Sequence, residues 1–488
     1  MLERNRMKIF TVLFAAFLLG IPSTIGAALP PATRPNVLFI AVDDLRDWVG
    51  YLGRNPQTLT PNIDKLAARG VLFTRSYCAA PVCNPSRAAL MSGLRPSSTG
   101  VYDNGDNFAK FIPEDITLTT QFRKAGYYVC GAGKIFHNSV YRPGEWDDHL
   151  KKADRQSEDK PNQVKAGKLD ITPFNCRDED MPDYQFVSYG LEQLNRKRDQ
   201  PLFVAVGLIK PHLPWSVPKK YYERFPLETI QLPPYKEDDL DDLPPIGLKM
   251  ARGNGDHEAI LREGTNSWKK AIQAYLGCIN FCDTMVGRLL DGFDKSPVAT
   301  NTIICFWSDH GWHLGEKHHW RKFALWEEAT RSPFIWVVPG ITRPNSRCDR
   351  TVDFMSIYPT LTDLCGIPTP KHIQGESIRG LLANPQMPWD RSAITTYHYM
   401  NHAIRSEGWR YIRYSDGGEE LYDEKNDPNE WTNLAKQSGF SSKKSELSQW
   451  LPKENKREPK GNDRFGDESE GKSRKKSGTA KIGGDASK

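Results

Sequence analysis

Five runs of apolar residues recur along the chain, each short and each bounded by polar or turn-forming residues. They lie at 36–42, 127–132, 202–208, 302–308 and 334–338. Continuous apolar character over this length is typical of strands that are buried on both faces of a sheet. The pattern therefore predicts a sheet with both faces covered.

Helical stretches lie between these runs. Thr60 followed by Pro61 is typical of a helix start, and this helix is expected to end near Gly70. Longer helices are expected at about 267–294 and 353–364. Strands that alternate with helices predict an α/β domain with a large, mainly parallel sheet flanked by helices. In such sheets ligands bind beyond the carboxyl ends of the strands.

The remaining segments have a different character. Residues 145–200 and 226–265 are charged, rich in proline and weakly periodic, so we interpret them as surface excursions. Short apolar stretches at 393–399, 409–414 and 420–422 alternate with turns, which predicts a small antiparallel C-terminal subdomain. We expect the main domain at 29–375, the subdomain at 376–452 and a disordered charged tail at 453–488.

The N-terminus has the pattern of a signal peptide over residues 1–28. Arg4, Arg6 and Lys8 precede an apolar stretch at 9–21, and small residues follow at 26–28. The alternative is an uncleaved membrane anchor. We expect an exported protein, periplasmic or extracellular, or lysosomal in a eukaryote, with no stable membrane insertion after signal cleavage. The short signal and the lysine-rich tail favour a bacterial periplasm.

The overall charge of +6 does not belong to the body of the protein. The first eight residues carry a net charge of +2 and residues 453–488 carry +4, which leaves residues 9–452 without net charge. No bulk basic field is present to attract nucleic acid, so no nucleic-acid partner is expected. Any anion site must be built locally.

Polar side chains follow four of the predicted strands, at the point where each strand ends. Asp43 and Asp44 follow the first run, Lys134 and His137 the second, His212 the third, and Asp309 and His310 the fourth. The carboxyl ends of parallel strands meet at one edge of a sheet, so these groups are expected to converge. Three aspartates favour Ca²⁺ or Mg²⁺, and a metal beside Lys and His suits a tetrahedral anion.

The nine cysteines do not show the spacing of a zinc site. Export permits disulfides, but their pairing cannot be deduced from the sequence. The odd number indicates that at least one cysteine has another role. Cys83 could be an ordinary buried thiol or could pair with Cys78, and the segment around it suggests a third possibility.

That segment contains Cys83-x-Pro85-Ser86-Arg87, followed by Ser92 and Gly93. It resembles the signature of the type I sulfatases, which convert the cysteine to formylglycine with a separate maturation enzyme. Ser92 departs from the threonine that the family more often has. The resemblance extends over about 35–435, is strongest to the iduronate-sulfatase branch, and implies an alkaline-phosphatase-like fold.

The resemblance also implies roles for individual residues. One Ca²⁺ per chain, with Mg²⁺ as the alternative, would be held by five residues: Asp43, Asp44, Cys83, Asp309 and His310. The expected catalytic residues are Cys83 as formylglycine, Arg87, Lys134, His137, His212 and Lys322. His212 would protonate the leaving sugar oxygen, with Lys322 as a further donor, and His137 would act as a base. From chemistry alone, Lys317 is as plausible as Lys322.

The implied function is hydrolysis of sulfate esters on a sulfated carbohydrate. Two alternatives remain open: a phosphodiesterase or phosphonate hydrolase of the same superfamily, and a secreted sugar-binding protein without turnover. Tyr102, Asp103 and Asn104 are expected at the substrate mouth or in a simple turn. Trp312 and Trp320 are expected either to face the sugar or to pack in the interior.

Overall fold

The computed structural model describes residue 1 and residues 34–137, 142–159 and 161–457. The expected signal peptide and residues 458–488 of the expected tail lie outside the described residues. Eight strands form the main sheet in the order β12-β2-β11-β8-β1-β7-β3-β4. All neighbours in this sheet pair in parallel except at β11, which is antiparallel to β8 and β2. The strands are β1 (Asn36–Val42), β2 (Val71–Tyr77), β3 (Tyr128–Gly133), β4 (Asp148–Leu150), β7 (Leu202–Leu208), β8 (Thr302–Ser308), β11 (Phe334–Val337) and β12 (Ser346–Asp353).

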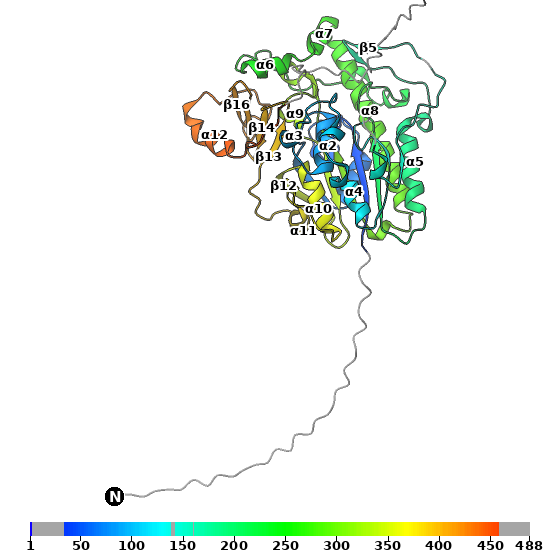
Figure 1. Cartoon of the computed structure of the whole chain (residues 1–488). Helices are drawn as coiled ribbons and strands as arrows, with labels where there is room; N and C mark the ends of the chain where they lie inside the picture. The colour runs from blue at the N-terminus through cyan, green and yellow to red at the C-terminus, as the bar shows by residue number, and fades with distance from the viewer. Residues whose placement is uncertain (2–33, 138–141, 160, 458–488) are drawn as a thin grey trace, which may run out of the picture. The chain divides into compact units, whose positions relative to one another are not determined.

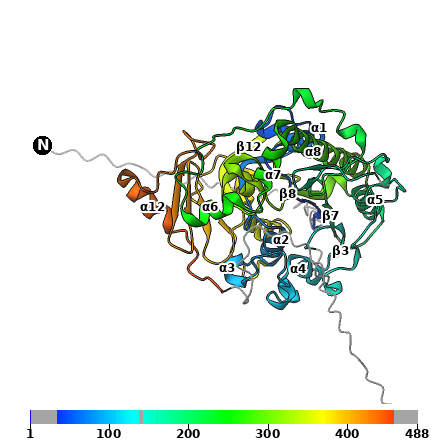
Figure 2. The same ribbon diagram turned by 90° about the horizontal axis from the view of Figure 1, so that it is seen from above.

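Helices cover both faces of this sheet, as the apolar strand runs require (Figures 1 and 2). One face packs against α1 (Pro61–Ala68), α5 (Pro182–Asn195) and α8 (Thr265–Phe293). The other packs against α2 (Cys83–Ser92), α4 (Leu118–Lys124) and α10 (Ile357–Leu364). The fold is therefore the predicted α/β class. The other short elements are α3 (Pro96–Thr99), α6 (Pro245–Arg252), α7 (Asp256–Glu263), α9 (Glu327–Thr330), α11 (Arg379–Ala383), β5 (Lys165–Ala166), β6 (Leu169–Asp170), β9 (His313–Leu314) and β10 (Trp320–Arg321).

The interpretation of 145–200 and 226–265 as surface excursions was wrong for part of each segment. Helix α5 lies in the first and packs on β7 and α8, with Val187 and Leu194 in the core. Met250 of α6 and Ile260 of α7 are also buried. The apolar residues of these helices are spaced over few turns and interrupted by Gly and charged residues, which makes the helical period hard to detect.

The C-terminal subdomain contains a four-stranded antiparallel sheet in sequential order. Its strands are β13 (Ala393–Thr396), β14 (His402–Arg405), β15 (Trp409–Arg413) and β16 (Glu419–Asp423), followed by α12 (Ser441–Ser448). Three of these strands coincide with predicted ones. Strand β14 was not predicted from the sequence, because a run of only four residues leaves little signal.

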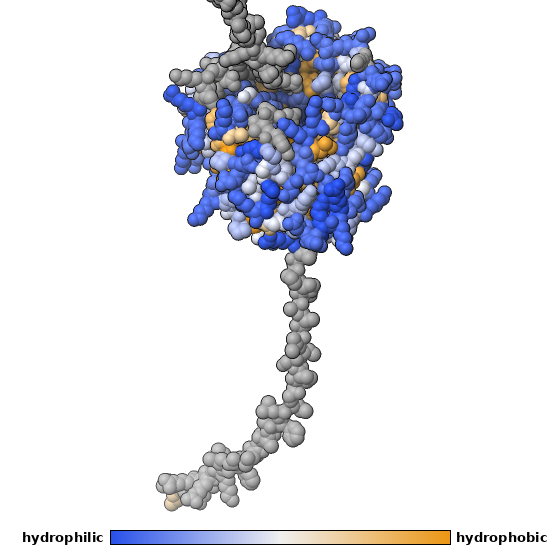
Figure 3. All heavy atoms as spheres, turned by 45° about the vertical axis from the view of Figure 1, so that its right-hand side comes forward, coloured by the Kyte–Doolittle hydropathy of each residue, from blue (hydrophilic) through white to orange (hydrophobic). Residues whose placement is uncertain are grey.

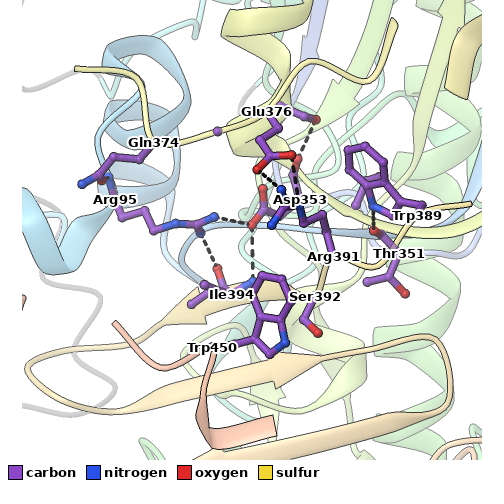
Figure 4. A pocket seen from close by; sticks show the side chains of 13 residues that line it. Arg95, Thr351, Asp353, Gln374, Glu376, Trp389, Arg391, Ser392, Ile394 and Trp450 are labelled. Atoms are coloured by element: carbon purple, nitrogen blue, oxygen red, sulfur yellow. Dashed lines mark hydrogen bonds and ion pairs between the residues drawn. The ribbon is translucent and has the colours of Figure 1, made fainter. Parts of the chain in front are cut away.

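Paired charges join this small sheet to the main domain. Arg95, just after α2, binds Asp353 at the end of β12 (2.8 Å) and the carbonyl oxygen of Ile394 in β13 (3.2 Å). Figure 4 shows this junction, where Arg391 also pairs with Glu376. The two sheets are thus connected by ion pairs as well as by packing.

The nine cysteines are all free thiols in the described parts of the chain. No described helix combines the length and apolar character needed to span a membrane. On the face seen in Figure 3, hydrophilic residues predominate and hydrophobic ones form small separate spots. This face therefore has no broad apolar surface of the kind that marks an obligate interface.

Candidate active site

Four adjacent strands, β8, β1, β7 and β3, carry the predicted site residues at their carboxyl ends. The loop after β2 adds Cys83 at the start of α2, and the segment after β10 adds Lys322. All the predicted residues therefore come together at one edge of the sheet. Two of them, His137 and His212, are half-buried, whereas the side chains around Cys83 are almost fully enclosed.

Two glycines allow β3 and β7 to approach closely where Lys134 leaves the sheet. Gly133 has a φ of +74°, and a Cβ there would lie 2.1 Å from the carbonyl oxygen of Gly207. A Cβ on Gly207 would in turn lie 2.4 Å from the carbonyl oxygen of Lys134. Only glycine fits this contact, which fixes the direction of Lys134.

Asp44, Cys83, Asp309 and His310 form a cluster with the spacing of a metal site. The Nε2 atom of His310 lies 3.4 Å from Cys83 Sγ and 3.4 Å from Asp44 Oδ1. It also lies 3.7 Å from Asp309 Oδ2. His310 Nδ1 is 2.9 Å from the carbonyl oxygen of Gly311, a contact that requires Nδ1–H and leaves Nε2 directed into the cluster.

The electrostatics of this cluster favour a cation. Burial raises the pKa of Asp44 well above its usual range, and Cys83 and Asp43 raise it further against the opposing charge of Lys322. Burial lowers the pKa of His310, but Asp309 and Cys83 outweigh burial and raise it to about 9. Both shifts reflect surplus negative charge in a fully buried space. A hard divalent cation fits these oxygen and nitrogen donors.

Asp43 pairs with two positively charged side chains, Lys134 and Arg87. Its carboxylate pairs with Lys134 and lies 3.3 Å from a terminal nitrogen of Arg87. Burial raises the pKa of Asp43, but Lys134, His212 and Arg87 outweigh burial and lower it well below its usual range. Arg87 also binds Asp309 Oδ2 (2.8 Å). Lys134 and Arg87 therefore favour the ionised form of Asp43.

The two candidate lysines, Lys317 and Lys322, have different partners. Lys322 Nζ lies 3.2 Å from Cys83 Sγ and 3.0 Å from Asp44 Oδ1. Lys317 is instead buried against Asp239 (2.7 Å) and the carbonyl oxygen of Glu430. Lys322 thus occupies the position at the site, and Lys317 connects the main domain to the C-terminal subdomain.

The two half-buried histidines have lowered pKa values. Burial, and then the charge of Lys134, lower the pKa of His137 to about 3. Its buried Nδ1 atom has no hydrogen-bond partner among the described residues. Burial also lowers the pKa of His212 well below its usual range, although Asp43 opposes this. The His212 ring contacts the carbonyl oxygen of Leu213 through Nδ1, and its Nε2 lies 3.8 Å from Asp44 Oδ2. Both rings are therefore neutral at neutral pH in this state.

Cys83 lies near two positively charged lysines and is the first residue of helix α2. Burial raises the pKa of the Cys83 thiol, but Lys134 and Lys322 outweigh burial and lower it. Its place at the first position of α2 adds the favourable end of the helix dipole for a negative group. Asn104 and Asp103 bind the backbone and side chain of Asn84 beside it. The predicted 102–104 segment therefore lies at the signature helix.

The sequence analysis missed three supporting residues. Ser86 Oγ donates to the carbonyl oxygen of Asp309 (2.6 Å), and Tyr275 of α8 donates to that of Asp44 (2.7 Å). Asp183 of α5 accepts from the backbone N–H groups of Ile209 (2.8 Å) and Lys210 (3.0 Å), which precede His212. Ser86 lies within the motif and could have been included. Tyr275 and Asp183 are distant in sequence and carry no local signal.

Trp312 and Trp320 belong to the interior. Their exposed fractions are 0% and 2%, and Trp312 packs edge-on against Trp215. Of the two alternatives for these tryptophans, the structure supports packing.

Comparisons with known proteins bear on the family of this chain. The family model described as Sulfatase matches residues 35–367, and one described as N-sulphoglucosamine sulphohydrolase, C-terminal, matches residues 315–457. A sulfatase of Formosa agariphila is 42% identical over 86% of this chain and 87% of its own length. Human iduronate 2-sulfatase is 31% identical over 69% of this chain and 70% of its own length.

A solved structure shows the same fold. The phosphonate monoester hydrolase of Agrobacterium radiobacter superposes with a TM-score of 0.73 at 21% identity, over 85% of this chain and 94% of that one. This likeness supports the alkaline-phosphatase-like architecture and no particular substrate. With the family model matched over most of the chain, this protein belongs to the sulfatase family of sulfuric ester hydrolases.

Proposed function

We propose that this sulfatase hydrolyses sulfate esters on a sulfated carbohydrate that contains uronic acid, using formylglycine made from Cys83 and one divalent cation, with Ca²⁺ preferred. The observation that carries the proposal is the enclosure of Cys83 by carboxylates on one side and by Lys134 and Lys322 on the other. The similarity to human iduronate 2-sulfatase supports the proposed uronic-acid substrate class.

Formylglycine suits this enclosure because its hydrate carries two hydroxyl groups on one carbon. One hydroxyl oxygen attacks sulfur, the ester S–O bond breaks, and the sugar oxygen takes a proton. The second hydroxyl then loses its proton, its oxygen forms the carbonyl, and the C–O bond to sulfate breaks. Water hydrates the aldehyde again. A cation bound at the cluster would polarise a sulfate oxygen and lower the pKa of one hydroxyl.

Side chains of the site can be assigned to each step of this reaction. Arg87 pairs with Asp43 and Asp309, Lys134 pairs with Asp43, and Lys322 adds positive charge beside residue 83. His137 is neutral, as a base must be, and is proposed to take the proton of the second hydroxyl. His212 is proposed to protonate the sugar oxygen, with Lys322 as the alternative donor. Because His212 is neutral without ligand, it must gain its proton when the anionic substrate binds.

Two further proposals concern the setting. The pattern at residues 1–28 supports export, so the protein would meet its polysaccharide outside the cytoplasm. The Cys83-x-Pro85-x-Arg87 segment supports recognition by a formylglycine-generating enzyme before folding. Cys83 is fully buried in the folded chain, which fits conversion before rather than after folding.

The test is sulfate release from a defined panel by protein co-expressed with a maturation enzyme. The panel contains terminal 2-O-sulfated iduronate, other sulfated glycosaminoglycan and algal oligosaccharides, and a phosphonate monoester. Release from a sulfated uronic acid, and none by Cys83→Ala, is the expected result. Faster turnover of the phosphonate monoester than of every sulfate ester would overturn the proposal.

A further inference from the structure

A second cavity lies beside the active site and shares none of the predicted catalytic or metal-site residues. Its volume is about 400 Å³. We name it the Glu328 pocket; the polar and aromatic side chains that line it include Arg46, Trp48, Arg54, Glu316, Glu328 and Asn429. Arg46 is two residues from Asp44, so their Cα atoms are at most about 7 Å apart. This spacing places one wall of the pocket close to the predicted site.

Glu328 is the unusual group in this cavity. It is 5% exposed, yet its carboxyl group makes no hydrogen bond or close ion pair with any other described residue. Its neighbour Glu316 is satisfied by Arg46 (2.7 Å) and by the backbone N–H of Leu314 (2.7 Å). A buried carboxyl group without a partner in the chain is costly unless water or a ligand in the pocket satisfies it, so Glu328 is available to a ligand that enters.

Other groups in the pocket are also available. Arg54 binds Asp47 through Nε (3.2 Å), and its two terminal nitrogens make no hydrogen bond within the described chain. The amide of Asn429 likewise has no described partner. By contrast, the charged groups in the pocket of Figure 4 are paired with each other, Arg95 with Asp353 and Arg391 with Glu376. Free donors and acceptors therefore distinguish the Glu328 pocket.

The chemistry of these groups selects the kind of ligand. Arg46 and Arg54 oppose a metal ion, and the Glu316 carboxylate opposes an anion. A neutral ligand with adjacent hydroxyl groups can use Arg54 as donor and Glu328 as acceptor or donor. Burial and the charge of Glu316 raise the pKa of Glu328 to about 8, although Arg46 and Arg54 oppose this, so the carboxyl group can donate at neutral pH. Trp48 and the neighbouring Pro233 and Pro234 supply apolar wall, as sugar rings require.

We propose that the Glu328 pocket is a second carbohydrate site that binds a neutral sugar unit of the chain whose sulfated unit lies at residue 83. This inference rests on the proposed function. It makes the protein a sulfatase of oligosaccharides or polysaccharides rather than of single sugars.

Binding is measured directly, so that turnover is not needed. The Cys83→Ala protein is titrated by calorimetry with two unsulfated probes, a chondroitin hexasaccharide and a desulfated dermatan hexasaccharide. We expect at least one to bind with a Kd below about 1 mM. Asn429→Trp, which fills the pocket, should weaken this binding at least about tenfold. The control Asp390→Trp, at a side chain 98% exposed, should not change it.

A second pair of variants tests Glu328 itself. Glu328→Gln keeps a donor and an acceptor and should retain binding within about threefold, whereas Glu328→Leu should lose about tenfold or more. Absence of binding by both probes, or equal binding by the parent and Asn429→Trp, would overturn the inference. Sulfate release from a small aryl sulfate by the converted Asn429→Trp enzyme is measured separately. It should persist, and its absence in the parent enzyme would instead overturn the proposed function.

Discussion

At the scale of single residues, the site depends on how charge is distributed around residue 83. Asp44 and Asp309 place negative charge beside His310 on one side, and Lys134 and Lys322 supply positive charge on the other. Asp44 also has a φ of +62°, which turns its carboxylate toward Cys83. Asp tolerates this left-handed conformation better than most residues, and such strain is typical of functional sites.

Cys83→Ser tests why the residue needs two hydroxyl groups. Serine can attack sulfur, but it has no second hydroxyl whose deprotonation expels sulfate. We expect the variant to accumulate covalent sulfate at residue 83 and to release less than about one sulfate per site over many turnover times. Mass spectrometry of the peptide measures this. Sustained turnover by Cys83→Ser would contradict the role of the hydrate.

His212→Ala tests proton donation to the leaving group. Loss of a general acid costs roughly 10²–10⁴ in rate when the leaving oxygen needs a proton. We expect a loss of this size with a sulfated sugar and a much smaller one with 4-nitrophenyl sulfate, whose phenoxide leaves without help. Equal losses in kcat on both substrates would mean that another group is the proton donor, and Lys322 would then be the next candidate.

His137→Ala tests the second half of the reaction. Without a base, the second hydroxyl keeps its proton and sulfate stays attached to residue 83. We expect covalent sulfate to accumulate after one fast turnover, followed by release slowed by about 10² or more. Rapid quench with mass detection follows this species. If the first step slows and no adduct accumulates, His137 acts elsewhere.

The contact residues of the site could be predicted from sequence because each follows a recognisable strand or lies in one motif. Chemistry alone did not decide between Lys317 and Lys322, since both are buried. The family resemblance selected Lys322, and the structure separates the two lysines by the groups that they face. Tyr275 and Asp183 were missed because their partners are backbone atoms far along the chain.

At the scale of elements, the sheet order explains the convergence. Strands β8, β1, β7 and β3 are adjacent, so the predicted side chains that follow these four strands lie at one edge of the sheet. The apolar runs predicted these strands within a residue because burial on both faces leaves a continuous signal. Helix α5 was missed although it has 14 residues, because polar residues and a glycine interrupt its apolar face. Strand β14 was missed because it has only 4 residues.

Asp183→Asn tests how α5 positions the segment that carries His212. An amide has one acceptor oxygen, so only one of the N–H groups of Ile209 and Lys210 keeps a good partner. The cost is about 1–3 kcal/mol for the unsatisfied group. We expect a clear fall in kcat on sulfated sugars with a small change in KM.

The matched control is Asp199→Asn, at an exposed position on the segment between α5 and β7. It should leave kcat and thermal stability unchanged. Unchanged kcat in Asp183→Asn, with only reduced stability, would mean that Asp183 supports the fold and has no part in positioning His212.

At the scale of the whole molecule, buried neutral histidines link folding to pH. Burial is the main cause that lowers the pKa of both His257 and His402 to about 4. A histidine whose folded pKa is depressed takes up protons more readily when unfolded. Stability from such a group is present above its unfolded pKa of about 6.5 and is lost as pH falls toward 4.

Chemical unfolding at several pH values tests this link. We expect the free energy of unfolding to fall between pH 6.5 and 4, and His402→Gln to remove up to about 3 kcal/mol of that fall. His402 is 3% exposed, so little screening by solvent applies. An equally steep pH dependence in His402→Gln would show that His402 is not neutral in the folded state.

The central claim is that residue 83, as formylglycine, is the group that turns over sulfate esters. The most direct measurement compares two forms of the same chain, one with Cys83 and one converted, each verified by mass spectrometry, on the preferred sulfated sugar. The account predicts release by the converted form alone, with loss on chelation and recovery with Ca²⁺. Equal release by the form that retains Cys83 would contradict it.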